Sequence, residues 1–421
     1  MEKITFENLK LIPSILKALR EENYKEPTSI QTKSIPIILN REDVLGSAQT
    51  GTGKTAAFAI PIIQHLSNDQ RNSRDKQKIL SLVITPTREL AIQIGESFTT
   101  YGKYTNVKNT VIFGGVPQRS QTNILKRGVD VLVATPGRLL DLIDQGYISL
   151  QDVKYFVLDE ADRMLDMGFI NDIKKILNKL PRERQSLFFS ATMPKNIINL
   201  SQKILINPKK VEVNPVSSTA ETIHQYLYTT NKTSKGKLLL HILKDPEINK
   251  VLIFSRTKHG SDRIVRKLLK KNIPSAAIHG NKSQNQRQKA LQAFKKGSIR
   301  VLIATDIAAR GIDIDKLRYV INYDIPNQSE SYVHRIGRCG RAGEYGIAIS
   351  IGEPEEIEYI RDIEKLIKQK IEIVSKNPFP QTDKPMAIAE KKKLEKKKQK
   401  IKQAFFANRN KKNALQKRNK R

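Results

Sequence analysis

Two short segments of the sequence carry residues whose types and spacing suit phosphate chemistry. The first is AQTGTGKT at 48–55, which follows an apolar run and opens a helical pattern. Glycines in such a loop let backbone N–H groups approach phosphate oxygens, Lys54 supplies positive charge, and the Thr55 hydroxyl can hold Mg²⁺. The loop departs from the usual pattern at Ala48, where a glycine is common. The residues predicted to surround the phosphates are Ala48, Gln49, Thr50, Gly51, Thr52, Gly53, Lys54 and Thr55.

The second segment is a group of carboxylates at the end of another apolar run, YFVLDEAD at 155–162. There Asp159 can hold Mg²⁺ through water, and Glu160 can act as the base that activates a water molecule. Taken alone, these residues also suit an ordinary helix N-cap. The phosphate loop upstream favours the catalytic interpretation, so the two segments together predict hydrolysis of a nucleoside triphosphate.

The elements that must position these residues follow a repeating pattern. Short apolar runs alternate with helical patterns from residue 43 to residue 352, which is typical of parallel βαβ units. The predicted strands lie within 43–48, 79–87, 129–136, 155–162 and 185–192, and then within 250–257, 275–280, 300–306, 319–324 and 347–353. Most of these runs end abruptly in Ser, Thr, Asp, Gly or Pro. Because ligands bind beyond the carboxyl ends of such strands, these ends mark the predicted functional edge.

The length of 421 residues suits two domains of an α/β class with residues left over. We predict a first domain over 1–207 and a second over 223–375. The segment between them, 208–222, is rich in Pro, Ser and Thr and is predicted to be a linker. After about residue 375 the apolar pattern fades, so 376–421 is predicted to be a solvated basic tail or a lone exposed helix.

Positive charge dominates the composition. The chain has 75 Lys+Arg against 42 Asp+Glu, a formal net charge of +33, which points to a polyanionic partner. A lysine-rich composition throughout accounts for part of this excess. The predicted tail nevertheless holds 17 Lys+Arg and only 3 Asp+Glu, so the charge is concentrated there.

Other classes of protein are disfavoured. The single cysteine, Cys339, excludes an internal disulfide and a thiolate zinc site, which suits a reducing cytosol. The start MEKITFENLK lacks the apolar region of a signal peptide, and no apolar run approaches the ~20 residues of a membrane helix. We expect a cytoplasmic protein with no membrane partner and, by default, a monomer.

Further motifs follow one another in the order found in DEAD-box RNA helicases. They are Phe6, Pro27-Thr28 with Ile30-Gln31, AQTGTGKT, Pro86-Thr87-Arg88-Glu89-Leu90, Gly114-Gly115, Thr135-Pro136-Gly137-Arg138, DEAD at 159–162, Ser190-Ala191-Thr192, ATDIAARGID at 304–313 and HRIGRCGRAG at 334–343. Over about residues 1–370 the chain resembles an ATP-dependent RNA helicase of this family, most like the bacterial RhlE-like group. The resemblance implies two tandem RecA-like domains that close on ATP, Mg²⁺ and single-stranded RNA.

The resemblance also implies roles around the nucleotide. Gln31 would read the adenine edge, and Phe6 would stack on the base. Arg338 and Arg341, from the second domain, would reach the γ-phosphate as arginine fingers, which contribute ~10³ to 10⁵ in rate. Asp313 would contact the ribose. The residues that would couple the nucleotide to RNA are Asp162, Ser190, Thr192 and His334.

The RNA contacts implied by the resemblance come from loops of both domains. They are Thr87, Arg88, Gly115, Thr135, Arg138, Arg287, Thr305 and Arg310. Backbone amides and arginines that face phosphates and 2′-hydroxyls do not read sequence. We therefore expect sequence-independent binding, local opening of short duplexes on closure, and release after hydrolysis.

Several alternatives stay open. The same two domains could drive a DNA translocase, or serve as an ATP-gated RNA clamp or annealing chaperone. Ribosomal particles and an RNA-decay nuclease are both conceivable partners. The tail could bind RNA or a protein, and its RNA contacts would steepen the salt dependence of binding by ~0.7 in log-log slope per cation. Cys339 replaces the usual threonine between the two arginines, either as a small buried filler or as a thiol open to oxidation.

Overall fold

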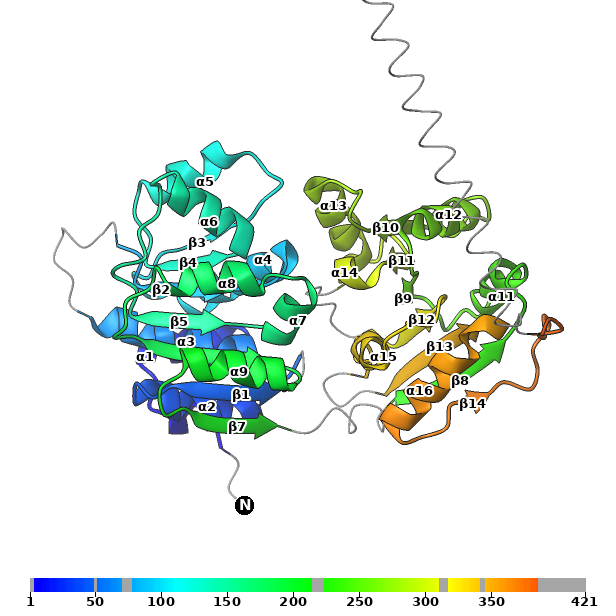
Figure 1. Cartoon of the computed structure of the whole chain (residues 1–421), viewed down its shortest axis with the longest axis horizontal. Coiled ribbons are helices and arrows are strands. Elements are labelled where there is room, and N and C mark those ends of the chain that lie inside the picture. Colours follow the sequence, from blue (N-terminus) through cyan, green and yellow to red (C-terminus); the bar gives the residue numbers. More distant parts are fainter. Residues whose placement is uncertain are drawn as a thin grey trace, which may run out of the picture.

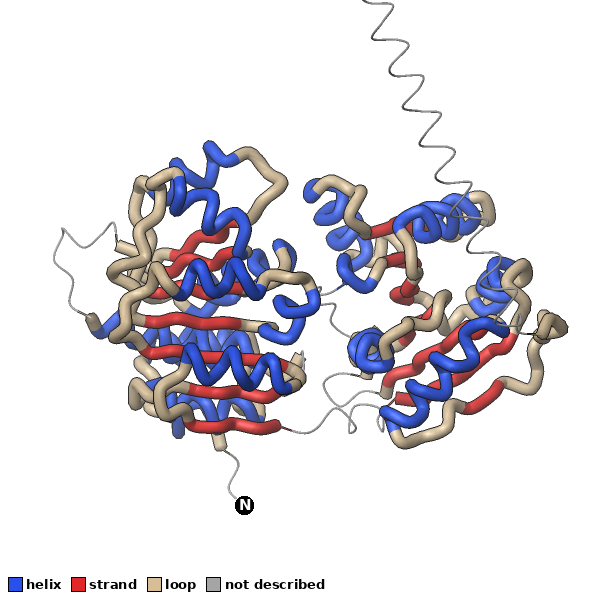
Figure 2. Tube along the Cα trace, viewed as in Figure 1, coloured by secondary structure: helices blue, strands red, loops and turns tan. Residues whose placement is uncertain are grey.

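The computed structural model describes residues 4–48, 51–69, 78–213, 223–309, 317–340 and 345–384. These residues form two α/β domains that lie side by side (Figure 1), each built on a seven-stranded sheet. All the strand pairings in both sheets are parallel. Helices cover both faces of each sheet (Figure 2). The predicted tandem α/β architecture is confirmed.

The sheet of the first domain has the strand order β3-β4-β2-β5-β6-β1-β7. Its strands are β1 (Val44–Ala48), β2 (Ser81–Ile84), β3 (Asn109–Ile112), β4 (Val131–Ala134), β5 (Tyr155–Leu158), β6 (Gln185–Ser190) and β7 (Lys209–Val213). Its helices are η1 (Phe6–Leu9), α1 (Pro13–Glu21), α2 (Ser29–Leu39), α3 (Lys54–Asn68), α4 (Arg88–Tyr101), α5 (Gln118–Leu125), α6 (Pro136–Asp144), α7 (Ala161–Asp166), α8 (Ile170–Leu177) and α9 (Lys195–Ile204).

Two hydrophobic layers sandwich this sheet. Side chains alternate between its faces, so in β5 Tyr155 and Val157 pack with α1 to α4, whereas Phe156 and Leu158 pack with α5 to α9. All four side chains are buried. A strand that is buried on both faces reads as a continuous apolar run, which is why these strands were visible in the sequence.

The second domain repeats the same strand order as β10-β11-β9-β12-β13-β8-β14. Its strands are β8 (Ile223–Thr229), β9 (Val251–Phe254), β10 (Ser275–Ile278), β11 (Val301–Ala304), β12 (Tyr319–Asn322), β13 (Gly346–Gly352) and β14 (Glu372–Ile373). Its helices are α11 (Lys235–Ile242), α12 (Lys258–Leu269), α13 (Gln284–Lys295), α14 (Asp306–Ala309), α15 (Ser329–Ile336), η3 (Pro354–Glu356) and α16 (Ile357–Ile367). Helices α11 and α12 cover one face, and α13 to α16 cover the other.

All ten predicted strands are present, but four strands of the structure were not predicted. These are β3, β7, β8 and β14, which lie at or next to the sheet edges. Their burial is incomplete, as in β8, where buried positions alternate with more exposed ones. Such strands mix polar and apolar residues, so they lack the apolar run that identified the central strands.

Two predicted domain boundaries need correction. The strand β7 lies inside the segment predicted as linker, and it pairs with β1 from Val44 to Ala48, so the first sheet extends past residue 207. The segment predicted as tail also begins too early. Asn377 donates from Nδ2 to the carbonyl of Thr229 at 2.8 Å, and the Thr230 hydroxyl donates to the carbonyl of Phe379 at 2.6 Å. The rest of the predicted linker, 214–222, and of the predicted tail, 385–421, lies outside the described residues.

In the part of the chain that the structure describes, none of the helices has the length and apolar character needed to cross a membrane.

The packing of β1 against β6 generates a stability prediction. A Cβ added at Gly46 would lie 2.4 Å from Cδ1 of Phe189, a fully buried ring, and overpacking of this kind costs about 1–3 kcal/mol. We expect Gly46→Ala to lower the melting temperature of the first domain. Gly137→Ala, whose Cβ would have no neighbour within 4 Å, is the matched control. Equal melting temperatures for the two variants would contradict this packing.

Candidate functional site

The phosphate loop lies between β1 and α3, at the carboxyl edge of the first sheet. Gly53 has φ of 90°, a left-handed conformation that favours glycine, and α3 begins at Lys54. The Lys54 side chain is buried, with Nζ donating to the carbonyl of Ala48 at 2.6 Å. Burial lowers the pKa of Lys54, while Asp159 and Glu160 oppose this change. Gln49 and Thr50 lie outside the described residues.

Gln31 lies against this loop from the first turn of α2. Its Oε1 accepts a hydrogen bond from the backbone N–H of Thr28 at 2.9 Å, and its Nε2 donates to the carbonyl of Gly53 at 3.1 Å. A Cβ at Gly53 would lie 2.4 Å from Gln31 Nε2. The glycine therefore lets the amide reach the loop, and the predicted neighbourhood of Gln31 and the phosphates is present.

The two predicted catalytic carboxylates follow β5 and face the loop. Asp159 and Glu160 are 2% and 4% exposed. Glu160 has φ of 56°, an uncommon left-handed conformation for a residue with a side chain, and its carboxylate pairs with Arg163. Arg163 was not predicted as a site residue, although it lies only three residues after Glu160, in the first turn of α7.

These groups fit a magnesium-bound triphosphate. Burial raises the pKa of Asp159 to about 7, and repulsion from Glu160 adds to the effect of burial, against attraction from Lys54. A buried carboxylate with a raised pKa favours a bound cation. Asp159 and Thr55 would hold Mg²⁺, which would neutralise charge on the phosphates.

The wall of the nucleotide pocket differs from the expectation for Phe6. This ring is 3% exposed and stacks on Tyr24 with 6.3 Å between centroids. The pocket is lined by Tyr24, which was not predicted, together with Gln31 and Tyr101. The Tyr24 and Tyr101 hydroxyls lie 3.2 Å apart. Phe6 thus lies behind Tyr24. Of the two tyrosines that line the pocket, Tyr24 is 40% exposed and Tyr101 is 6% exposed, so Tyr24 is the ring more accessible to a base.

The predicted coupling group of the first domain is connected. Asp162 Oδ2 accepts hydrogen bonds from both the backbone N–H and the hydroxyl of Thr192, each at 2.9 Å. The Ser190 hydroxyl accepts from the N–H of Asp162 at 3.2 Å and donates to the carbonyl of Thr192 at 2.9 Å. These hydrogen bonds tie the loop after β5 to the loop after β6. A contact from His334 to this group stays a prediction.

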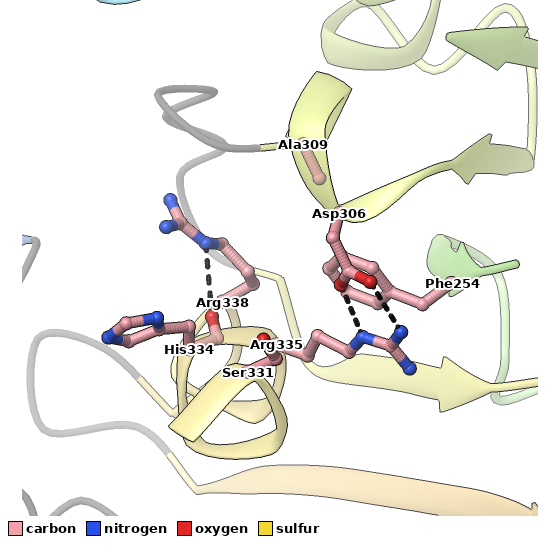
Figure 3. Close-up of a pocket in the computed structure, with 7 residues that line it drawn as sticks. All are labelled: Phe254, Asp306, Ala309, Ser331, His334, Arg335 and Arg338. Carbon is pink, nitrogen blue, oxygen red and sulfur yellow. Dashed lines mark hydrogen bonds and ion pairs between the residues drawn. The ribbon is translucent and has the colours of Figure 1, made fainter. Parts of the chain in front are cut away.

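In the second domain, Arg338 and His334 lie at the end of α15 (Figure 3), where Arg338 Nε donates to the carbonyl of His334 at 3.3 Å. Both side chains point away from Arg335, whose guanidinium binds Asp306 through bonds of 2.5 and 2.7 Å. Arg335 is buried and stacks 5.1 Å from the centroid of the Phe254 ring. It was not predicted, and it anchors α15, which ends two residues before Arg338.

Three predicted residues of this domain, Arg310, Asp313 and Arg341, lie outside the described residues. Cys339 is 1% exposed, and its thiol donates to the carbonyl of Ile336 at 3.0 Å. The structure therefore favours the small buried filler over the exposed thiol.

A cleft of about 520 Å³ lies between the two domains. The predicted RNA-contacting residues that line it are Thr87, Arg88, Thr135, Arg138 and Arg287. Gly115 lies beside it, because a Cβ there would be 2.3 Å from the Arg88 guanidinium. Thr305 does not line this cleft; it follows β11, with its N–H 3.4 Å from the carbonyl of Ile278.

A carboxylate that was not predicted bridges this cleft. Glu89, in the first turn of α4, is buried and accepts a hydrogen bond from Gln284 Nε2 at 3.0 Å. It also pairs with Arg287 at 3.0 Å. Both partners belong to the first turn of α13, so the starts of two helices from different domains meet. Glu89 lies within a predicted motif, but its partner 198 positions away could not be inferred from local sequence.

The second sheet has a lysine at the place that corresponds to Lys54, but carboxylates of the same domain neutralise its charge. Lys235 begins α11 after β8, as Lys54 begins α3 after β1. Its Nζ lies 2.8 Å from Glu356, and 3.8 Å from both Asp324 and Glu353. These carboxylates fill the surroundings of the lysine, so the described part of the second domain leaves no open cation for a phosphate at this position.

The aromatic wall predicts a selective effect on nucleotide binding. Replacing Tyr24 with alanine removes a ring that can stack on a base, an interaction of about 1–3 kcal/mol, so KM for ATP should rise by roughly tenfold. Tyr24→Phe keeps the aromatic ring, so its KM for ATP should stay close to that of the parent protein. Steady-state kinetics at saturating RNA measure both variants. A normal KM for Tyr24→Ala would show that the base does not stack there.

The raised pKa of Asp159 predicts a pH dependence. The carboxyl is largely protonated below about pH 7, and a cation requires the ionised form, so binding of Mg²⁺·ADP releases a proton. Affinity should fall by roughly tenfold between about pH 8 and pH 6, as titration calorimetry can measure. Asp159→Asn should bind weakly without this dependence. Equal affinity of the parent protein at both pH values would contradict the assignment.

Comparison with known proteins gives a consistent result. The DEAD/DEAH box helicase family profile matches residues 28–200, and the helicase conserved C-terminal domain profile matches residues 234–343. The chain is 43% identical over 371 residues to the DEAD-box ATP-dependent RNA helicase RhpA of Helicobacter pylori, covering 88% of this chain and 74% of that protein. It is 42% identical over 368 residues to CshA of Geobacillus kaustophilus, covering 87% and 78%.

Solved structures agree with the sequence relatives. The S. cerevisiae protein Dbp5 bound to RNA and ADP BeF3 superposes with a TM-score of 0.79 at 30% identity, covering 88% of this chain and 95% of that one. With the phosphate loop, the DEAD carboxylates and the paired parallel sheets in place, the chain belongs to the DEAD-box ATP-dependent RNA helicase family.

Proposed function

We propose that this protein is an RNA-dependent ATPase that binds single-stranded RNA in the cleft between its domains and locally opens short duplexes. The main support is the cleft, because it brings Arg88, Arg138 and Arg287 together with too few hydrogen-bond acceptors for their guanidinium groups. Arg138 Nη1 and Arg287 Nε are buried and have no hydrogen-bond partner among the described residues. A phosphate backbone would supply the missing acceptors.

The charges in the cleft support the same ligand. Burial lowers the pKa of Arg88, and repulsion from Arg287 and Arg138 lowers it further. Glu89 offsets only part of this repulsion. A polyanion that lies across both domains would relieve it, and contacts to phosphates would not read sequence.

The hydrolytic step is assigned to the edge of the first sheet. Lys54 would bind the phosphates, and Glu160 would accept the proton of the attacking water. Arg338, and Arg341 beside it in the sequence, would complete the site from the second domain. Hydrolysis would then require closure, which couples it to RNA bound in the cleft.

The test measures ATP hydrolysis without nucleic acid, with single-stranded RNA, and with DNA of the same sequence. We expect strong stimulation by RNA alone. Glu160→Gln should lower the RNA-stimulated rate by ~10² to 10⁴, whereas Glu183→Gln, the same change at an exposed position, should leave it unchanged. Equal stimulation of hydrolysis by DNA would favour a DNA translocase. If neither nucleic acid stimulates hydrolysis, the proposal is wrong.

A second candidate function is an ATP-gated clamp or annealing chaperone, since the cleft that binds RNA need not open duplexes. Unwinding of a short duplex with ATP, compared with a non-hydrolysable analogue, separates the two. Turnover of duplexes only with ATP supports the helicase, whereas annealing with either nucleotide supports the clamp.

For the biological role, we propose only two kinds of RNA substrate. Structured RNA in ribosomal particles, or RNA that a decay nuclease degrades, would provide the short duplexes this cleft could open. With either substrate, the proposed setting is the cytoplasm. The RhlE-like subgroup stays a proposal based on sequence motifs.

A further inference from the structure

Helix α12 of the second domain has a positively charged exposed surface. From Lys258 to Lys271 the chain contains six Lys or Arg residues and a single acidic one, Asp262. His259, Arg263, Arg266 and Lys270 are all exposed. Their spacing of four, three and four residues places them on one side of the helix, opposite the buried Ile264 and Leu268. We call these four residues the basic stripe.

The only carboxylate of this segment does not neutralise the stripe. Asp262 Oδ1 lies 3.0 Å from both Lys282 Nζ and His279 Nε2, so it is already shared between two partners from the loop after β10. Arg266 makes a hydrogen bond to a backbone carbonyl, that of Asp262, at 3.4 Å. Arg263, Arg266 and Lys270 therefore face solvent without an ion pair to any of the described residues, and uncompensated clusters of this kind attract polyanions.

The helix that carries the basic stripe begins close to the rim of the interdomain cleft. Lys258, at the start of α12, donates from Nζ to Asn281 Oδ1 at 2.8 Å, and the neighbours of Asn281, Gly280 and Lys282, line the cleft. From there α12 extends along the second domain on the far side of α13 from the first domain (Figure 1). Its 1.5 Å rise per residue carries the cations about 20 Å from the rim.

We propose that the basic stripe is a second RNA-binding surface, which holds the phosphate backbone of the strand that leaves the cleft over the second domain. The inference rests on the proposed RNA binding in the cleft and extends it. RNA is the favoured polyanion because the helix with the stripe begins close to a cleft that presents unsatisfied arginine donors. A strand bound in that cleft could extend directly onto the stripe, whereas nothing in this arrangement favours an acidic protein. The surface would hold the enzyme on longer RNA without reading its sequence.

The test combines a charge-neutralised variant with RNAs of different length. The variant is Arg263→Gln/Arg266→Gln/Lys270→Gln, at exposed positions that should not affect folding. The control, Lys203→Gln/Lys244→Gln/Lys368→Gln, removes the same charge from exposed lysines elsewhere. Affinity is measured by fluorescence anisotropy, with a non-hydrolysable ATP analogue and over a range of salt. The RNAs are a strand that only fills the cleft, and that strand extended at its 5′ end, its 3′ end or both.

For the parent protein, extension at one end should strengthen binding. The stripe variant should lose this gain, weakening affinity for that RNA by roughly 10-fold to 100-fold and lowering the log-log salt slope by about 2. Affinity for the short strand and the control variant should be unchanged. If the stripe variant binds every extended RNA as the control does, or weakens the short strand equally, the inference is wrong. Failure of the parent protein to bind the short strand would instead remove the proposed function.

Discussion

Parallel strands place all their carboxyl ends on one edge of a sheet, and both halves of this chain depend on that constraint. In the first sheet it sets Lys54, which begins the helix after β1, beside Asp159, which follows β5. The second sheet has the same strand order and puts Lys235 and Asp324 at the corresponding places. There two further glutamates neutralise the lysine. One framework therefore leaves a phosphate site open in the first domain and closes it in the second.

The second domain does not hold a phosphate beside Lys235. Its described residues instead form one wall of the interdomain cleft. Its α13 meets the first domain through Arg287 and Gln284, which share the carboxylate of Glu89. Arg338 follows the end of its α15, a helix that the ion pair between Arg335 and Asp306 anchors to the domain. The cleft is thus built by both domains, and Arg338 is proposed to reach the nucleotide pocket of the first domain. Such shared contacts would let a ligand at one site change the affinity of the other site.

The sequence predicted the central strands and the chemical groups at their ends, because both are local signals. A strand buried on both faces is an apolar run, and a phosphate loop is a short motif between a strand and a helix. Edge strands such as β7 gave no such signal, since their polar residues face solvent. Contacts between residues far apart in the sequence could not be predicted either, as the ion pair between Glu89 and Arg287 shows. Tyr24 was missed for a different reason, because only the packing of Phe6 beneath it shows which ring faces the pocket.

We propose that hydrolysis needs an arginine from the second domain at a nucleotide bound by the first domain. The most direct measurement compares Mg²⁺·ATP binding and RNA-stimulated hydrolysis in the parent protein and in Arg338→Ala, with melting curves to confirm folding. We expect the variant to bind ATP with unchanged affinity while its rate of hydrolysis falls by ~10³ or more. A folded variant that hydrolyses ATP at the parent rate would contradict it.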